Sequence, residues 1–426
     1  MTRRAMIEFE ETPNSTLLVE GEAEVEVDGR AEVFGCPVEK LRVPRGRVVP
    51  VLILEKSLVK ISGVSGVSGV SGNYIRLNGS TIPESWEKLA KSEFDSIFIF
   101  GDVDSGKSSL ATFLVNRMDG SKDVFDFDIG QSDIAHPGAM GYSLATGRVL
   151  HISQLQMQDG YFIGSISPAG RESICLKAVA KLNKLRMGDR AIFDSTGWVK
   201  GRKARDYKLA KLEILEPEVI ACFGEVPYYL DGYDVLRVDS FVVKKRSREL
   251  RCKIREEVYR ENLNGALKRT FRVEQNGIKL GNTSLFSGEE VNLEGIIDSV
   301  VYAERGYDFL NVFTSTPHKS SPSVIKSLCE IFEVQEVNIV CVDELEGLMV
   351  GLYRKRGDSG ERYLGMGLLE SIDFENREIE VFTRVRENVS RIDFGEIRLQ
   401  KLEGHHEGHE GYEGYEGFKE YFIRVP

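Results

Sequence analysis

The residues of this chain best suited to chemistry form one unbroken glycine-rich segment, Gly101-Asp102-Val103-Asp104-Ser105-Gly106-Lys107-Ser108-Ser109. It fits the pattern GxxxxGK[ST], in which successive backbone N–H groups turn inward around a phosphate. The Lys107 ammonium would neutralise the β- and γ-phosphate oxygens, and the Ser108 hydroxyl would reach Mg²⁺. The apolar run Ser96–Phe100 precedes the segment and a helical pattern follows it. We therefore expect a strand, a phosphate loop and a helix whose N-terminus adds its dipole at a nucleotide site.

Two carboxylates follow the next expected strand, in the run DFDIGQ at 126–131. Side chains alternate along an extended chain, so Asp126 and Asp128 should point to the same side. The carboxyl end of a parallel strand lies beside the phosphate loop. We expect Asp126 to belong to the Mg²⁺ shell and Asp128 to accept a proton from an attacking hydroxyl. The alternative is that one of the two carboxylates merely caps a loop or a helix, or that both are structural.

A third candidate segment, Asp194-Ser195-Thr196-Gly197-Trp198, ends another expected strand and contains the DxxG pattern of GTPases. A GTPase should also carry an Asn/Thr-Lys-x-Asp tetrapeptide, whose Asp selects guanine. The run NKLR at 183–186 lacks that acidic residue, which disfavours a GTPase. Trp198 precedes Lys200, Arg202, Lys203 and Arg205, so it could stack a base within a basic patch. Ordinary core packing is the alternative for Trp198.

Arginines dominate the start of an expected helix at 247–267; they are Arg246, Arg248, Arg251 and Arg255. The last three fall on one helix face, at spacings of three and four residues. Such arginines, on a segment that closes over a triphosphate, would stabilise the charge of a transferring phosphoryl group. A solvent-exposed charged helix is the alternative.

The composition is that of a folded, acidic protein. Of 426 residues, 41% are apolar, and 56 Lys+Arg against 67 Asp+Glu give a net charge of −11. This length suggests about two or three domains, and the acidic balance argues against a non-specific nucleic-acid coat but not against a local basic groove. Apolar runs are too short for a membrane span, the first residues lack a secretion signal, and the six cysteines show no CxxC spacing. We expect a soluble, cytoplasmic protein.

The hydrophobic pattern divides the chain into four parts. Residues 1–90 resemble a small β sandwich or barrel, in which Ala23, Val25 and Val27 alternate with acidic residues before a hairpin turn at Asp28-Gly29. Residues 91–274 alternate strands and helices, which predicts an α/β fold: a parallel P-loop NTPase sheet with helices on both faces. Residues 275–403 form a β-rich mixed domain, and 404–426 a low-complexity tail. The expected elements of the central part are strands 96–100, 124–127, 190–194 and 219–223 and helices 107–116, 171–187, 202–215 and 247–267.

Two low-complexity segments are interpreted as flexible. The Ser-Gly-Val triplets at 62–72 favour a loop between two strands. In the tail, His405, His406 and His409 could hold a metal, but a glycine-rich segment does not preorganise their side chains.

Together these motifs resemble those of one family, the polynucleotide 5′-hydroxyl kinases related to the pre-mRNA cleavage-complex and rRNA-processing kinases. In length the chain is most similar to an archaeal-type member. The matching parts are the phosphate loop Gly101–Ser109, the run Asp126–Gln131 with Pro137-Gly138, Gly164–Pro168, the clasp Ser195–Trp198, the lid Arg246–Arg255 and, in the β domain, Gly29–Gly35.

The resemblance implies ATP-dependent phosphorylation of the 5′-hydroxyl of RNA, with DNA left open as a further substrate and Mg²⁺ as the metal. It implies that Lys107 and Ser108 contact phosphate and Mg²⁺, that Asp128 is the base and that the lid arginines contact the γ-phosphate. Arg246 and Arg251 are our choices among those arginines. Gln131 and the clasp would lie on the substrate side; the clasp begins with Ser195 where the family usually has Thr.

Two other functions stay open at this stage. One is an ATP-binding scaffold of an RNA-processing assembly that transfers no phosphate. The other is a GTPase-like switch or a small-molecule kinase.

Overall fold

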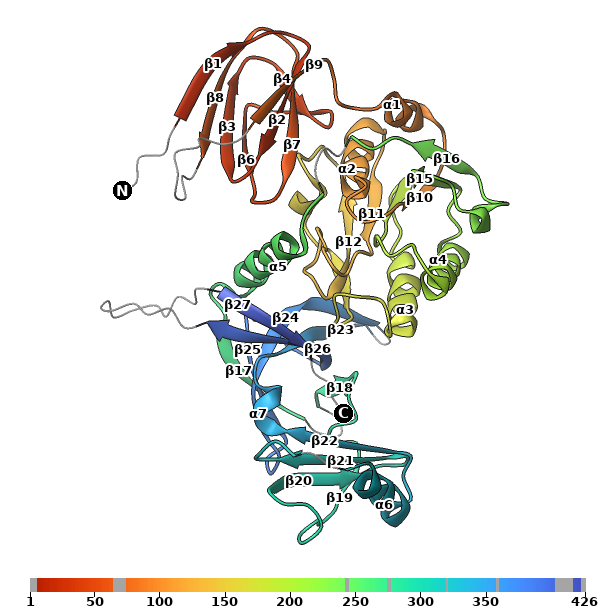
Figure 1. The fold of residues 1–426 in the computed structure, drawn as a ribbon, viewed down its shortest axis with the longest axis vertical. Coiled ribbons are helices and arrows are strands. Elements are labelled where there is room, and N and C mark those ends of the chain that lie inside the picture. The colour runs from red at the N-terminus through yellow and green to blue at the C-terminus, as the bar shows by residue number, and fades with distance from the viewer. Residues whose placement is uncertain are drawn as a thin grey trace, which may run out of the picture. The chain divides into compact units, whose positions relative to one another are not determined.

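The computed structural model describes residues 6–63, 74–241, 245–273, 277–318, 321–357, 360–402 and 417–422. The chain forms two compact units (Figure 1). The first comprises Met1–His136, Met140–Gln158 and Ala169–Arg255, and the second Pro137–Ala139, Asp159–Pro168 and Glu256–Pro426. Most of the triplet repeat, and the three tail histidines with their expected solvation, lie outside the described residues.

The N-terminal sandwich, strands β1 to β9, consists of two sheets with the orders β1-β8-β3-β6 and β5-β4-β7-β2-β9. Apolar residues of both sheets, such as Val25 and Val51, share one hydrophobic cluster, because alternate side chains of each strand point inward. The expected small β domain is confirmed as a sandwich. Its strands are β1 (Met6–Glu11), β2 (Ser15–Glu20), β3 (Ala23–Asp28), β4 (Ala31–Val33), β5 (Cys36–Pro37), β6 (Lys40–Val43), β7 (Val48–Ile53), β8 (Ser57–Gly63) and β9 (Tyr74–Asn78).

The predicted hairpin at Asp28-Gly29 is wrong. Strand β3 pairs with β6 and β8, whereas β4 pairs with β5 and β7, so this turn carries the chain from one sheet to the other. A glycine is still required here: Gly29 has φ +138°, and a Cβ would lie 2.2 Å from Oγ of Ser57. The turn signal was correct, but turn residues do not decide which strands pair.

The centre of the first unit is a sheet of order β12-β11-β14-β10-β15-β16. From β11 to β16 its strands are parallel, which confirms the predicted α/β sheet. Strand β12 runs antiparallel to β11 and was not predicted. The strands are β10 (Ser96–Phe100), β11 (Lys122–Asp126), β12 (Ala139–Ala145), β14 (Arg190–Asp194), β15 (Val219–Phe223) and β16 (Val235–Val238).

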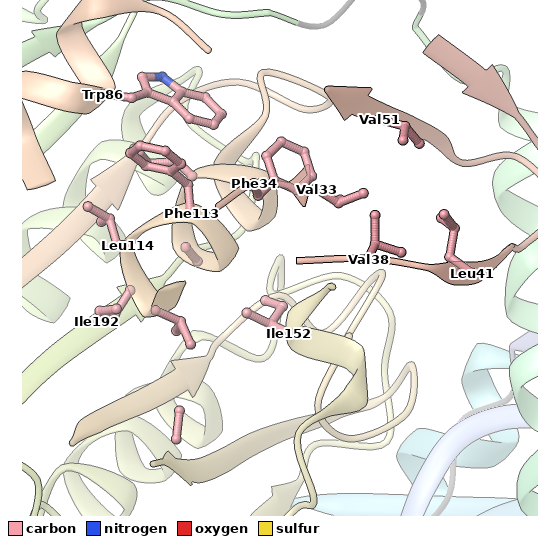
Figure 2. Packing of buried hydrophobic residues seen from close by; sticks show 14 of the residues in the cluster. Val33, Phe34, Val38, Leu41, Val51, Trp86, Phe113, Leu114, Ile152 and Ile192 are labelled. Atoms are coloured by element: carbon pink, nitrogen blue, oxygen red, sulfur yellow. The ribbon is translucent and has the colours of Figure 1, made fainter. Parts of the chain in front are cut away.

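Helices cover both faces of this sheet, and the alternation along β10 shows how. Ile97 and Ile99 belong to the same hydrophobic cluster as Phe113 of α2. Figure 2 shows Phe113 among other members of this cluster. Phe98 and Phe100 face the other way, with the ammonium of Lys208 on α4 at 5.7 and 5.9 Å from their ring centroids. Helices α1 and α2 therefore cover one face, and α3 and α4 the other. Their bounds are α1 (Glu84–Lys91), α2 (Lys107–Arg117), α3 (Glu172–Asn183) and α4 (Arg202–Leu215).

Short elements and the lid helix complete the first unit. The 3₁₀ turns η1 (Ile152–Gln154) and η2 (Tyr228–Leu230) follow β12 and β15. Helix α5 (Arg248–Leu263) starts in the first unit, which ends at Arg255, and continues into the second.

The second unit is β-rich, as expected. One sheet has the order β17-β25-β24-β23-β26-β18, with β27 beside β26, and another has the order β19-β20-β21-β22. Because β17 pairs with β25, the C-terminal sheet begins before residue 275, the predicted boundary. The bounds are β13 (Asp159–Phe162), β17 (Leu267–Arg272), β18 (Lys279–Gly281), β19 (Glu289–Glu290), β20 (Val300–Arg305), β21 (Phe309–Thr314), α6 (Pro322–Phe332), β22 (Glu336–Cys341), α7 (Val342–Leu345), β23 (Leu348–Arg356), β24 (Gly360–Asp373), β25 (Glu378–Thr383), β26 (Arg391–Leu402) and β27 (Gly417–Phe422).

Candidate active site

The phosphate loop joins β10 to α2 in the conformation that its glycines predict. Gly106 has φ +102° and lies directly before the helix. Lys107 is only 7% exposed, and its ammonium donates a hydrogen bond of 2.8 Å to the carbonyl oxygen of Asp102. Residue Ser105 adds a buried hydroxyl without a partner among the described residues. The loop thus surrounds one buried cation with polar groups that a phosphate could engage.

Asp194, at the end of β14, lies next to this loop. Its Oδ2 accepts a 2.7 Å hydrogen bond from the hydroxyl of Ser108, and its Oδ1 is buried without a partner in the described part of the chain. Burial raises the pKa of Asp194 to about 7, against the lowering effects of Lys107 and of the Ser108 hydrogen bond. The sequence analysis did not name Asp194 as a ligand, although its place at the end of a strand beside β10 is a usable signal.

Asp126 organises the loop that follows β11. Its carboxylate accepts hydrogen bonds from the backbone N–H groups of Asp128, Asp133 and Ile134 and from the hydroxyl of Ser132. Burial and nearby carboxylates raise its pKa well above the usual range. These contacts match the alternative that Asp126 caps a loop. Because they occupy its carboxylate, they favour Asp194 as the metal ligand. A metal role for Asp126 stays a prediction.

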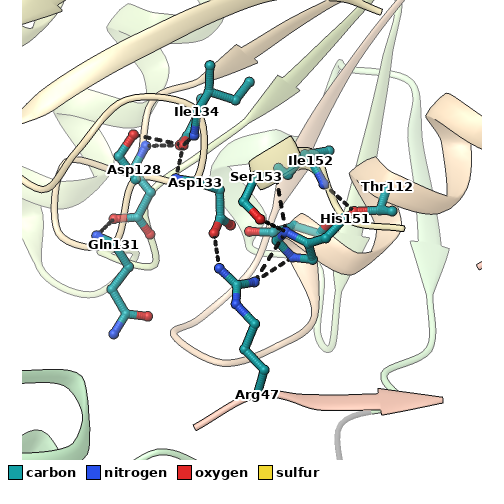
Figure 3. A network of polar contacts seen from close by, with 12 residues as sticks. Arg47, Thr112, Asp128, Gln131, Asp133, Ile134, His151, Ile152 and Ser153 are labelled. Carbon is teal, nitrogen blue, oxygen red and sulfur yellow. Dashed lines mark hydrogen bonds and ion pairs between the residues drawn. The ribbon is translucent and has the colours of Figure 1, made fainter. Parts of the chain in front are cut away.

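Asp128 lies in the same loop, and its carboxylate is only partly engaged. Its Oδ1 accepts hydrogen bonds from the backbone N–H groups of Gly130 (3.0 Å) and Gln131 (3.3 Å) (Figure 3). The charge of Asp128 contributes to the raised pKa of Asp194, so these two carboxylates lie close enough to interact electrostatically. The side chain of Gln131 carries a buried amide nitrogen that has no partner among the described residues.

The clasp, residues Ser195–Trp198, packs directly against the phosphate loop. Ser195 donates to the carbonyl oxygen of Ile99 at 2.7 Å, and a Cβ on Gly197 would lie 2.6 Å from the backbone nitrogen of Val103. Trp198 is half-buried, with its ring centroid 5.8 Å from that of Tyr207. Stacking of a nucleobase on Trp198 therefore stays a prediction.

A buried lysine holds the clasp, and sequence reasoning missed it. The fully buried ammonium of Lys208 donates to Oγ of Ser195 at 3.0 Å and to the carbonyl oxygen of Thr196 at 2.6 Å. Burial lowers its pKa well below the usual range, with Lys211 as the next cause. The available signal was its position on the apolar face of α4, between Tyr207 and Leu212.

Two of the four lid arginines reach the phosphate loop. Arg246 donates to the Asp104 carboxylate from Nε and Nη2, both at 2.8 Å, and Arg251 donates from Nη1 at 3.0 Å. The Asp104 side chain is only 4% exposed. Arg248 is exposed, and Arg255 donates to the sulfur of Cys252 at 3.4 Å. The structure thus brings our two chosen arginines to the loop, where they contact a carboxylate that the sequence analysis had placed only among the ATP-binding residues.

A further polar network lies beside the loop that carries Asp128 (Figure 3). Arg47, in the turn between β6 and β7, forms an ion pair with Asp133 and a 2.6 Å hydrogen bond with Nε2 of His151. Although burial opposes ionisation of Asp133, Arg47 and His151 together lower its pKa to about 2. Burial, followed by Arg47, lowers the pKa of His151 to about 3. Sequence reasoning identified none of these three residues.

The described residues contain no group of three or more His, Cys, Asp or Glu side chains that is arranged to hold a metal ion. None of their helices combines the length and apolar composition that crossing a membrane requires.

Comparison with known proteins gives consistent relatives. A family model described as "mRNA cleavage and polyadenylation factor CLP1 P-loop" matches residues 101–265. The chain is 27% identical to a polyribonucleotide 5′-hydroxyl-kinase of Pyrococcus abyssi, over 75% of this chain and 90% of that protein. It is 29% identical to one of Thermococcus kodakarensis, over 77% and 95%, respectively. A chain in the solved structure of the wild-type Clp1p–Pcf11p (454–563) complex shares the fold with a TM-score of 0.61 at 12% identity, over 92% of this chain and 98% of that one.

Proposed function

We propose that the chain is a member of the Clp1-related polynucleotide 5′-hydroxyl kinase family, archaeal type, and that it transfers the γ-phosphoryl group of ATP to the 5′-hydroxyl of RNA. One observation carries the proposal: Lys107, Ser108, Asp128 and Asp194 share one site at the carboxyl ends of parallel strands. A phosphate loop alone would fit many nucleotide-binding proteins. A partly engaged carboxylate beside it supplies what transfer to a hydroxyl needs in addition.

The proposed division of roles follows from the contacts. The backbone of Gly101–Ser109 and the Lys107 ammonium bind the triphosphate, and Asp128 orients the incoming hydroxyl and takes its proton. Arg246 and Arg251 contact Asp104 in the phosphate loop, so a change in their side-chain conformations would direct them at the γ-phosphate. Positioning and electrostatics supply the catalysis, since the transferred group needs little covalent help from the protein.

Ser108 and Asp194 are the residues that we propose for Mg²⁺. A hydroxyl and a carboxylate are the oxygen donors with which phosphate-loop enzymes hold this ion, together with phosphate oxygens and water. The buried Oδ1 of Asp194, which has no partner within the described ranges, fits such a role. When bound, Mg²⁺ would neutralise charge on the β- and γ-phosphates.

The substrate and compartment are part of the same proposal. RNA is favoured because the similar proteins are named polyribonucleotide kinases, and DNA is the alternative for the assay. Lys200 and Arg202 carry highly exposed charges directly after the clasp, where an RNA backbone could bind them in a salt-dependent way. All six cysteines are free, which suits the reducing cytoplasm.

The test is a transfer assay with γ-labelled ATP and matched RNA and DNA oligonucleotides that carry a 5′-hydroxyl. Label on the RNA end supports the proposal, and equal label on DNA would broaden the substrate class. Tight ATP binding without transfer would instead support a scaffold, and a preference for GTP would support a switch.

Two variants separate binding from transfer. Asp128→Asn should abolish transfer but retain ATP, because the amide cannot take the proton. Lys107→Ala should lose both properties. Asp189→Asn is the matched control. It replaces an exposed carboxylate that accepts a hydrogen bond from Ser121, and it should behave as wild type. Normal transfer by Asp128→Asn would remove Asp128 from the base role.

A further inference from the structure

Backbone hydrogen bonds hold the turn between β6 and β7 of the N-terminal sandwich, residues 44–47. The N–H of Arg47 donates to the carbonyl oxygen of Pro44 at 3.2 Å, and the carbonyl oxygen of Arg47 accepts from the N–H of Gly21 at 3.0 Å. Gly46 has φ +71°, a conformation that favours glycine. The backbone that carries the Arg47 side chain is thus fixed on both sides.

The start of the lid helix braces the same turn. A Cβ on Gly46 would lie 2.7 Å from Cδ1 of Ile254 and 3.2 Å from Cδ1 of Leu250, both on α5. The backbone of the turn and two apolar side chains of the lid are therefore in direct contact. This packing adds a second reason why the turn cannot move freely.

From this turn the Arg47 guanidinium reaches the loop that follows β11. It pairs with the Asp133 carboxylate, and the two side chains are only 25% and 10% exposed. The N–H of Asp133 in turn donates to the Asp126 carboxylate, which also binds the N–H of Asp128. One chain of contacts therefore runs from the sandwich through Asp133 and Asp126 to the residue proposed as the base.

The positive charge of Arg47 also compensates the negative charge of Asp133. Asp133 interacts electrostatically with both Asp126 and Asp194. Without the guanidinium, the loop would hold a largely buried carboxylate beside two others, and the least costly response is for Asp133 to move toward water. Such a movement would pull on the backbone that places Asp128.

We propose that Arg47 is a positioning residue for phosphoryl transfer: through Asp133 it holds the loop 127–134 so that Asp128 faces the acceptor hydroxyl. The proposal rests on the proposed kinase function. It also assigns a task to the N-terminal sandwich, which braces the acceptor side of the active site.

The test compares Arg47→Met with Arg42→Met, which removes an exposed arginine paired with Glu22 next to the same turn. For Arg47→Met we expect kcat to fall roughly 10- to 100-fold, since misplacement of a reacting group by about 1 Å costs that much. The Kd for ATP should change less than about threefold, because the phosphate loop is not touched. Amide hydrogen exchange of residues 128–134 should become faster, and Arg42→Met should leave all three quantities unchanged.

A double-mutant cycle distinguishes positioning from general damage. Asp133→Asn and the double variant Arg47→Met/Asp133→Asn should lose the same factor in kcat as Arg47→Met, because each breaks the same link. The double variant leaves no unpaired charge and keeps the test valid if Arg47→Met alone unfolds. Arg47→Lys should be intermediate, since one ammonium cannot contact both Asp133 and His151.

Either of two results would overturn the inference: losses that multiply in the double variant, or wild-type kcat with unchanged exchange in Arg47→Met. If wild type itself transfers no phosphate, the kinase proposal fails, whereas the exchange measurement still tests the link between Arg47 and the loop.

Discussion

Replacing Asp194 with asparagine should stabilise the protein in a pH-dependent manner while it abolishes transfer. Asp194 is 1% exposed and its pKa is raised to about 7, so the folded chain holds its proton more tightly than the unfolded chain does. The free energy of unfolding therefore falls as the pH rises from about 4 to 7, and this loss of stability is complete above that range. An amide at this position carries no charge, so the Asp194→Asn variant should not lose stability in this way.

The size of this stability change follows from the shift in the pKa of Asp194. Relative to the ordinary carboxyl value of 3.8, a pKa of about 7 corresponds to a loss of about 4 kcal/mol in unfolding free energy at pH 8 and about 2 kcal/mol at pH 5. The buried amide has its own desolvation cost, about 1–3 kcal/mol, which is the same at both pH values. The gain in unfolding free energy should therefore be about 2–3 kcal/mol larger at pH 8 than at pH 5.

Urea unfolding in EDTA, followed by tryptophan fluorescence, measures this difference. The chain has two tryptophans, Trp86 and Trp198, and both lie in the first unit with Asp194. Asp189→Asn is the control: hydrogen bonds from Ser121 lower the pKa of this exposed carboxyl, so its removal must not stabilise the protein at pH 8.

An equal effect of Asp194→Asn at both pH values would refute the reasoning. A loss of stability at pH 8 would do the same, because it would show that the carboxylate is ionised and well paired in the folded protein.

Three other variants test the contacts around the phosphate loop. Asp104→Asn should weaken ATP binding roughly tenfold in calorimetry, because the two lid arginines are no longer held at the loop and their ordering, about 0.5–1.5 kcal/mol for each side chain, must be supplied on binding. Gly197→Ala forces a Cβ to within 2.6 Å of the backbone nitrogen of Val103, and it should cost about 1–3 kcal/mol in unfolding free energy and reduce ATP affinity. Lys208→Met leaves the carbonyl oxygen of Thr196 without its buried donor; kcat should fall about tenfold in the transfer assay, while unfolding free energy changes by less than about 1 kcal/mol because a buried charge is also removed.

Each of these variants has a counterpart that should resemble wild type. Arg248→Ala removes an exposed lid arginine, and Gly147→Ala adds a Cβ that has no heavy atom of the described residues within 4 Å. Lys203→Met removes an exposed lysine from α4. An effect of a counterpart as large as that of its partner would show that general damage, not the named contact, explains the result.

Local sequence patterns were sufficient wherever neighbours in the chain are also neighbours in space. The glycines, Lys107 and Ser108 of the phosphate loop could be identified because one turn of backbone brings them to one phosphate. Strands 96–100, 190–194 and 219–223 were predicted with the bounds that the structure has, since apolar runs bounded by turn residues are a local signal.

Local signals failed where partners are distant in sequence. The turn at Asp28-Gly29 was recognised, but pairing of β3 with β8 depends on residues that come much later in the chain. Asp126 was the carboxylate predicted for the metal, and Asp194 was not considered. Both end a strand, and their hydrogen bonds distinguish them: four donors bind Asp126, whereas Asp194 accepts from Ser108.

The amino-acid sequence by itself determined the phosphate loop, the α/β sheet around it and the resemblance to a kinase family, because these depend on spacing within short segments. Only the tertiary structure decided that Asp104 binds the lid arginines, that Lys208 supports the clasp and that Arg47 binds Asp133. The physical reason is that these charged side chains are far apart in the sequence and only the fold brings them together. Spacing along a chain says nothing about which buried charge will lie beside which.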